Sequence, residues 1–461
     1  MASLSQELAK FVVETGFEDL PEPVVHEAKR ILLDSIGCAI AGIATDKGKI
    51  SIKLARRLGG PPESSIIGLG DKVSCFNAAF ANGELINALD YDPLLFPPGH
   101  VSPCVIPPSL AIAESNGASG KDMILAIVLG HEISVRISRC LPPQSQPIQE
   151  GVEKGSIKWA SAYGIINQCI FGGAVGAGKI LKLDAQQMTH ALGIAGYMCS
   201  GPTFLKWADA TPSAMTKQGS AGWAAAGGIN AALLAEMGYT GDATIFDGEY
   251  GFWRFFAAQK WEPDKATEKI GKEWFTLRTR YKLYPCGGVM DGALDCFISL
   301  INKNNLMPDD IQSVKAFCQP LTEKLVFRAN ELVSSTDSQF NLPYLIAVAA
   351  HRIKVEDWHD WDTLSNTKIL GFMKRVNYQS DPGSSESRRT AAVEVVARGK
   401  TFIEEKLPGT DSRATDEQLV EKFKQNVMTT LTQDKATEAI RSVLELEKVP
   451  DVAELIRQIT M

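Results

Sequence analysis

The sequence predicts a mainly α-helical protein with an α+β second domain. Apolar residues recur at three- and four-residue steps through most of residues 1–260, which is the spacing of amphipathic helices. Two shorter stretches, 311–318 and 391–396, alternate apolar and polar residues, as half-buried strands do. Beyond Pro408-Gly409 the helical spacing returns. These observations favour a large all-helical domain built from both chain ends around a smaller inserted domain.

Four stretches before residue 260 carry the clearest helical signals. Residues 24–36 follow two prolines that suit the start of a helix, and residues 121–140 repeat the spacing with an apolar centre. Asp184 is placed to cap a helix over 184–196. Residues 221–237 are rich in Ala and Gly, which let helices approach closely, so we expect a tightly packed interior helix there.

The insertion has its own signals. A hairpin is expected where the alternating stretch 391–396 passes through Arg398-Gly399 into 401–403. A helix is expected at 341–353 and an exposed loop at 381–387. The chain then returns to helices, which we expect at 415–428 and 432–447. The expected domains are an all-helical domain formed by 1–267 and 411–461, and an α+β domain at 268–410.

The composition is that of an ordinary globular protein. Of 461 residues, 45% are hydrophobic and 22% are charged, which argues against disorder as the main state. The net charge of −7 comes without any Lys/Arg-rich run, so we expect no nucleic-acid partner. A few local cations in a cleft would still suit a small anionic substrate.

The cysteines and the chain start point to a reducing, aqueous compartment. The nine cysteines are scattered without a Cys-x-x-Cys pair, which argues against a disulfide framework and a structural zinc site. The N-terminal residues lack the apolar core of a secretory signal, and no run of about 18 strongly apolar residues predicts a membrane span. We expect a cytoplasmic protein without membrane contacts.

The first candidate site is the segment from Asn87 to Pro103. Two carboxylates two residues apart, Asp90 and Asp92, cannot share a helix face, so we expect the chain to leave a helix here. His100 follows in a proline-rich stretch, and a carboxylate can fix the tautomer of such a histidine for acid–base work. The alternative is a solvated loop with capping aspartates.

Lys217 is the second candidate, because it enters the most Ala/Gly-rich helix of the chain. Burying an ammonium group is costly unless an anion meets it, and a substrate carboxylate would supply that partner. The alternative is a lysine whose head reaches solvent.

Two further segments are weaker candidates. Tyr163 lies in a Trp- and Ser-containing stretch, where a tyrosine is more often a packed aromatic than a catalyst. Tyr284-Pro285-Cys286 opens the α+β part and predicts a tight turn with a thiol at a cleft edge. A lone cysteine is weak evidence for a nucleophile.

Residues 173–179 have the G-x-x-x-x-G-K spacing of a phosphate-binding loop. However, Ile180 stands where a Ser or Thr hydroxyl would hold Mg²⁺. A closely packed small-residue helix explains the glycines without a nucleotide.

Several segments spread over nearly the whole chain resemble the MmgE/PrpD family. The ordered set is what is specific, and it comprises 28–37, 90–100, 191–196, Lys217 with the helix after it, 247–252, 284–286 and 338–344. The resemblance implies an all-helical domain with a smaller α+β domain, usually a homodimer, and no cofactor. Members of this family dehydrate 2-methylcitrate, decarboxylate cis-aconitate or epimerise iminodisuccinate.

The resemblance also implies site residues. Asp90, His100 and Lys217 match active-site positions at the domain cleft. Tyr163 falls where dehydratases and decarboxylases commonly have a histidine, and the epimerase is similar to this chain in having tyrosine there. We expect Lys217, Tyr284, Cys286 and Asp291 to bind substrate, with no metal ligands.

Three further positions depart from the family pattern. Leu94 replaces a threonine frequent in the decarboxylases, Val101 replaces the proline that usually follows His100, and Asp291 replaces a frequent histidine. These departures argue most strongly against plain cis-aconitate decarboxylation.

The three family reactions share a physical problem, since negative charge builds on a carboxylate as a neighbouring bond breaks. We expect Lys217 to pair with that carboxylate, His100 oriented by Asp90 to move a proton, and Tyr163 to act from the opposite side. The leading expectation is a dehydratase, a carbon–oxygen lyase, acting on a citrate-like or alkylcitrate-like acid. The alternatives are an epimerase or isomerase of a substituted dicarboxylate, a decarboxylase of a cis-aconitate-like acid, or an inactive scaffold.

Overall fold

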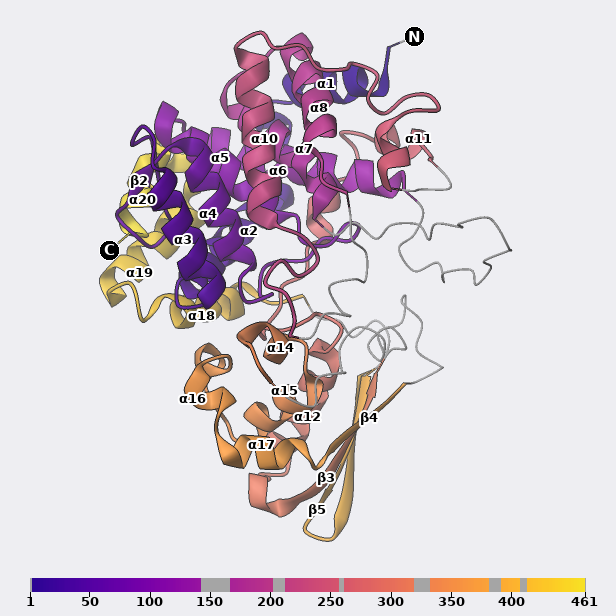
Figure 1. Cartoon of the computed structure of the whole chain (residues 1–461), viewed down its shortest axis with the longest axis vertical. Helices are drawn as coiled ribbons and strands as arrows, with labels where there is room; N and C mark the ends of the chain where they lie inside the picture. Colours follow the sequence, from indigo (N-terminus) through magenta and orange to yellow (C-terminus); the bar gives the residue numbers. More distant parts are fainter. Residues whose placement is uncertain are drawn as a thin grey trace.

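The computed structural model describes residues 2–141, 166–201, 212–256, 261–318, 332–380, 391–406 and 413–460. A helical part holds both the first helices and the last, and a smaller part combines short helices with a sheet (Figure 1). The mainly α class with an α+β part, expected from the sequence, is confirmed.

The helical part contains long helices and one short two-stranded pairing. Its elements are α1 (Leu4–Glu14), α2 (Glu22–Gly42), α3 (Asp46–Leu58), β1 (Ser64–Ser65), β2 (Lys72–Val73), α4 (Cys75–Asn87), α5 (Ser102–Asn116), α6 (Gly120–Arg139), α7 (Ile170–Ile180), α8 (Ala185–Met198), α10 (Ala221–Glu236), α11 (Asp264–Thr267), α18 (Asp416–Val427), α19 (Gln433–Leu444) and α20 (Val452–Gln458).

One apolar core joins these helices. Leu8 of α1, Leu32 of α2 and Ile127 of α6 belong to it, and so does Val443 of α19 near the C-terminus. Helices α18 and α19 pack against α2, and α20 packs against α5, so amphipathic helices from the two ends of the chain bury their apolar faces against one another. The helices expected from periodicity are therefore present, with ends that differ by a few residues.

The Ala/Gly-rich helix α10 packs as closely as expected. A Cβ atom added to Gly222 would lie 2.4 Å from the carbonyl oxygen of Phe80 in α4. One added to Gly228 would lie 2.8 Å from the amide nitrogen of Ala174 in α7. Any larger residue would push these helices apart, so the small residues are required by the packing.

The second part is built on a four-stranded sheet. Its elements are α12 (Asp291–Lys303), β3 (Ile311–Cys318), α14 (Ser335–Gln339), α15 (Leu342–Ala350), α16 (Trp361–Leu364), α17 (Thr367–Met373), β4 (Val376–Ser380), β5 (Ala391–Ala397) and β6 (Lys400–Lys406). The strand order is β4-β3-β5-β6, with β4 parallel to β3 and the other pairs antiparallel. Arg398 and Gly399 both have positive φ, as a two-residue hairpin turn requires, so the predicted hairpin is confirmed.

A separate apolar core holds the second part together. It begins at Cys286 and ends at Ala397, whereas Tyr281 and Ala414 belong to the first core. The chain therefore crosses between the cores twice, once just before Cys286 and once just before Ala414. The loop expected at 381–387 lies outside the described residues.

Residues 173–179 belong to helix α7 and form no phosphate-binding loop. The Lys179 ammonium group donates to the carbonyl oxygens of Val12 (2.8 Å), Val13 (3.0 Å) and Thr15 (2.8 Å). It therefore caps the C-terminal end of α1, where helix carbonyls lack partners.

No helix among the described residues is long and apolar enough to cross a bilayer.

Candidate active site

The site starts where α4 ends at Asn87 and the chain turns sharply. Asp90 has φ 53°, in the left-handed region that a non-glycine residue rarely adopts. Both Asp90 and Asp92 are buried, at 1% and 0% exposure. The predicted exit from a helix at this point is present, and the solvated-loop alternative does not fit the burial.

His100 lies between the two carboxylates. Its Nδ1 atom is 2.8 Å from Asp92 Oδ2, and its Nε2 atom is 3.5 Å from Asp90 Oδ1. Asn87 Nδ2 also approaches Nδ1, at 3.4 Å. The carboxylate that orients the ring is therefore Asp92, rather than Asp90 as we expected from the sequence. Proline 103 lies in the first turn of α5 and does not belong to the irregular stretch around His100.

Lys217 reaches the same place from a turn that precedes α10. Its Nζ atom donates to the backbone oxygen of Asn87 at 2.7 Å and lies 3.6 Å from Asp90 Oδ1. The residue is 1% exposed, so the alternative of a lysine head in solvent is wrong. Burial lowers the pKa of Lys217 to about 7, although the negative charge of Asp90 opposes this.

Lys282 completes the cluster and was not among the residues predicted from the sequence. Its Nζ atom is 2.7 Å from Asp90 Oδ2, and it also donates to the carbonyl oxygens of Asp90 and Cys286. Burial alone would lower the pKa of Lys282, but the charges of Asp90 and Asp92 outweigh it and raise this pKa.

These contacts also set the charge of the carboxylates. Burial alone would raise the pKa of Asp90, but Lys282 and Lys217 outweigh burial and hold that pKa well below its usual range. Burial alone would also raise the pKa of Asp92, but the interaction with His100 outweighs it and lowers this pKa. Both aspartates are therefore anionic near neutral pH.

Residues of the second part border the cluster. Gln339 Nε2 donates to the carbonyl oxygen of Ala88 at 3.1 Å, and the Phe340 ring centre lies 6.0 Å from Lys217 Nζ. The backbone nitrogen of Ser213, near Lys217, donates to Asp337 at 2.8 Å. The cluster thus lies at the junction of the two cores, where the sequence predicted a cleft between domains.

Among the described interactions, the hydrogen bond of the 284–286 turn to the cluster is made by the backbone oxygen of Cys286, which accepts from Lys282 at 3.1 Å. The Tyr284 hydroxyl donates to Asp295 in α12 at 3.1 Å, and its ring stacks on Trp358. The Cys286 thiol donates to Asp291 at 3.4 Å, and burial raises its pKa well above the usual value. A neutral thiol is a poor nucleophile, which leaves Cys286 with a structural contact to Lys282.

Tyr163 lies outside the described residues. Within the described ranges, no group of three or more His, Cys, Asp or Glu side chains is arranged to hold a metal ion.

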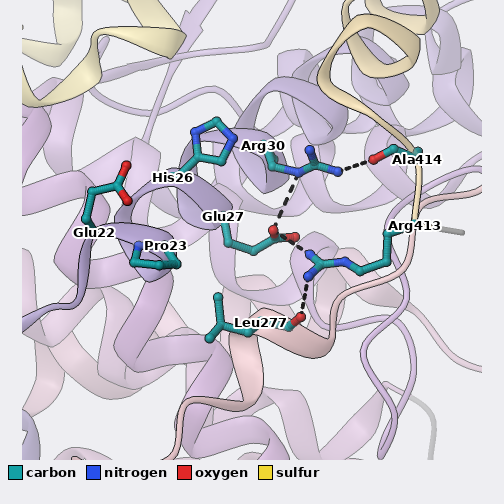
Figure 2. Close-up of a pocket in the computed structure, with 8 residues that line it drawn as sticks. All are labelled: Glu22, Pro23, His26, Glu27, Arg30, Leu277, Arg413 and Ala414. Atoms are coloured by element: carbon teal, nitrogen blue, oxygen red, sulfur yellow. Dashed lines mark hydrogen bonds and ion pairs between the residues drawn. The ribbon is translucent and has the colours of Figure 1, made fainter.

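A surface pocket of about 370 Å³ lies apart from the cluster, along the first turns of α2 (Figure 2). Its cations are already engaged: Arg413 contacts Glu27 at 2.5 Å and the carbonyl oxygen of Leu277 at 2.6 Å. Arg30 lies 3.5 Å from the same Glu27 and donates to the carbonyl oxygen of Ala414. Both arginines of this pocket are thus paired with groups of the chain itself, and the pocket joins separate parts of the sequence.

A helical body, an inserted α+β part and a buried cluster of charged side chains at their junction suit an enzyme that acts on a small charged molecule. The description "MmgE/PrpD N-terminal domain" matches residues 6–264, and "MmgE/PrpD C-terminal domain" matches residues 284–448. The chain belongs to the MmgE/PrpD family.

Similar proteins with curated names span the whole chain. A "cis-aconitate decarboxylase-like protein oryM" of Aspergillus oryzae is 24% identical, covering 99% of this chain and 97% of its own. The cis-aconitate decarboxylases of Aspergillus terreus and Homo sapiens are each 24% identical, covering 99% of this chain and 95% and 94% of theirs.

Proposed function

We propose that this chain is a lyase that removes water from a citrate-like or alkylcitrate-like polycarboxylic acid. The observation that carries the proposal is the buried cluster in which Lys217 and Lys282 share Asp90 beside the Asp92–His100 pair. Such a cluster can receive an anionic substrate and move a proton at it. The proposal requires no metal or organic cofactor.

The two lysines have different parts in this proposal. Loss of a proton beside a carboxylate puts negative charge onto that carboxylate, and the enzyme must bind this state more tightly than the substrate. Lys282 lies 2.7 Å from Asp90 and neutralises it, whereas Lys217 is 3.6 Å away. Lys217 is therefore the cation that can turn to the substrate carboxylate, in surroundings where burial strengthens the attraction.

His100 is the proton carrier. Because Asp92 accepts from Nδ1 at 2.8 Å, it is the imidazolium form of His100 that can give its Nε2 proton to the leaving hydroxyl, which leaves the neutral ring with its remaining proton on Nδ1. General acid–base help of this kind contributes roughly 10²- to 10⁴-fold in rate. Dehydration also needs a base at the carbon, and Tyr163 is our candidate for it from the sequence.

Leu94 supports dehydration over decarboxylation. Its buried side chain lies against Gly288 in the second part, and its backbone pairs with Arg280. Gly288 also borders Lys282, so this position places an apolar side chain and no hydroxyl close to the cluster, in contrast to the threonine frequent in decarboxylases of this family.

Decarboxylation of a cis-aconitate-like acid is the second candidate, and the names of the similar proteins favour it. In that reaction Lys217 would bind a retained carboxylate, and His100 would protonate the carbon skeleton as CO₂ leaves. At 24% identity these names do not fix the bond that breaks.

One experiment tests both candidates. Purified protein is incubated in D₂O with 2-methylcitrate, citrate or cis-aconitate and followed by proton NMR and mass spectrometry. Dehydration gives a new alkene with loss of water, decarboxylation gives loss of CO₂, and epimerisation gives deuterium uptake without either loss. Lys217→Ala and His100→Gln should be inactive with unchanged circular dichroism; turnover by Lys217→Ala at the wild-type rate would refute the proposed carboxylate clamp.

A further inference from the structure

Tyr91 lies between the two aspartates of the cluster and is held at three points. Its hydroxyl donates to the carbonyl oxygen of Leu283 at 3.1 Å. Its own carbonyl oxygen accepts from Lys422 Nζ at 2.9 Å, and the same ammonium lies 3.7 Å from the centre of its ring. Tyr91, which links Asp90 to Asp92, is therefore held by Leu283 at its hydroxyl and by Lys422 at its carbonyl oxygen and ring.

Lys422 comes from α18, more than 300 positions along the chain from Tyr91, and is 3% exposed. Its third partner is Asp34 of α2, with Nζ 2.7 Å from Oδ1. A lysine ammonium has three hydrogens to donate, and here a carboxylate, a carbonyl and a ring face are the acceptors. Moving the buried ammonium group of Lys422 away from these acceptors would leave its charge uncompensated, so the position of the group is well defined.

We propose that Lys422 is a positioning residue, which fixes the 90–92 turn by clamping Tyr91 and so sets the geometry of the catalytic groups. The inference rests on the proposed function of the cluster. Lys422 has no contact with His100, Lys217 or Lys282 among the interactions described, and it acts through Tyr91.

Both halves of the cluster depend on this turn. Asp92 fixes His100 and Asp90 fixes Lys282, at 2.8 and 2.7 Å. Asp90 has φ 53°, a conformation that persists only where the surroundings hold it. The Tyr91 hydroxyl also bonds to the residue after Lys282, so a shift of Tyr91 would move both contacts. The groups that face the His100 ring are Asp90 and Asp92 from the turn and Asn87 from α4.

The test compares Lys422→Met and the double variant Asp34→Asn/Lys422→Met with the wild type. The double variant leaves no unpaired carboxylate in the core, so its comparison with the wild type decides the role of Lys422. The matched control is Lys29→Met, because Lys29 of α2 also makes a partly buried ion pair with the C-terminal region, to Glu447 at 3.0 Å. Nitrogen-15 NMR of the histidine rings, with His100 assigned through His100→Gln, reports which ring nitrogen carries the proton.

We expect the double variant to change the His100 ring signals and to lower kcat about 10- to 100-fold, as loss of orientation does. Lys422→Arg, which keeps the charge, should recover part of kcat, and Lys29→Met should keep both the signals and kcat. A folded double variant with wild-type His100 signals would overturn the inference. Because NMR needs no substrate, it still decides the role of Lys422 if none of the three acids is turned over.

Discussion

Lys217 and Lys282 share one aspartate, yet their pKa values shift in opposite directions. Lys282 lies 2.7 Å from Asp90 and its pKa is raised, because attraction at that distance exceeds the cost of burial. Lys217 lies 3.6 Å away, and burial lowers its pKa to about 7. Near neutral pH, Lys282 therefore stays charged while Lys217 changes its charge.

This difference predicts the pH dependence of substrate binding. As pH rises through about 7, Lys217 loses its proton and with it the attraction to an anionic substrate. Once most of Lys217 is neutral, each further pH unit lowers its charged fraction about tenfold. We therefore expect KM to rise by about tenfold per pH unit on the alkaline side. Steady-state kinetics at constant ionic strength measures this.

Lys217→Arg is the control, because a guanidinium stays charged at all these pH values. If this variant retains activity, its KM should stay flat where that of the wild type rises. An alkaline rise of the same size in both proteins would assign the titration to another group.

Asp92 carries a second prediction. Asp92→Asn removes the negative charge that holds His100 Nδ1 at 2.8 Å, so the ring can adopt the unproductive tautomer. We expect kcat to fall about 10²- to 10⁴-fold, the range of general acid–base catalysis, with a small change in KM. Asp71→Asn, which removes a half-buried carboxylate paired with Arg56 away from the cluster, should leave kcat unchanged. Wild-type kcat in Asp92→Asn would refute the role given to this pair.

The residues of the site were only partly predictable. Asp90, His100 and Lys217 stand out because charged groups in Pro-rich or Ala/Gly-rich surroundings are unusual. Lys282 lies between Tyr281 and Leu283 in a stretch without periodicity, and nothing local shows that it reaches Asp90, 192 positions away. Long-range pairing of this kind is decided by the fold.

Among the elements, periodicity predicted those that bury one face and missed those shaped by other contacts. Helices α6, α8, α10 and α18 lie where apolar spacing placed them. Strand β4, which we did not predict, alternates apolar and polar residues over only four positions, too short a signal to stand out, and its parallel pairing with β3 fixes it in the sheet. Helix α5 contains Pro107 and Pro108, which normally end a helix, so its sequence argued against the structure it adopts.

Lys179 gives a prediction at this scale. It caps α1 with three hydrogen bonds to Val12, Val13 and Thr15, and bonds from a charged donor contribute more than neutral ones. We expect Lys179→Met to lower the free energy of unfolding by about 2 kcal/mol, with kcat of the folded protein unchanged. Urea denaturation measures this, and Lys182→Met, at an exposed lysine nearby, is the control. Equal stability of the two variants would contradict the capping role.

At the scale of the whole molecule, Glu27, which lines the pocket in Figure 2, contacts both stretches in which the chain crosses between the cores. Glu27 of α2 accepts from the Tyr281 hydroxyl at 2.7 Å, where the chain leaves the first core. The same carboxylate contacts Arg413 at 2.5 Å, where the chain returns to it. One buried side chain therefore ties both connections to α2, and Tyr281 is the neighbour of Lys282.

Glu27→Gln should consequently destabilise the molecule more than an ordinary surface change. Arg30 is buried beside Glu27, at 3.5 Å, and removing one partner of a buried ion pair leaves the other charge poorly compensated. We expect the free energy of unfolding in urea to fall by about 3 kcal/mol. Glu22→Gln changes an exposed carboxylate on the rim of the same pocket and should stay within about 0.5 kcal/mol of the wild type. If the two variants are equally stable, Glu27 does not join the crossings, and the two cores must be held together by the contacts around Asp90 and Gln339 instead.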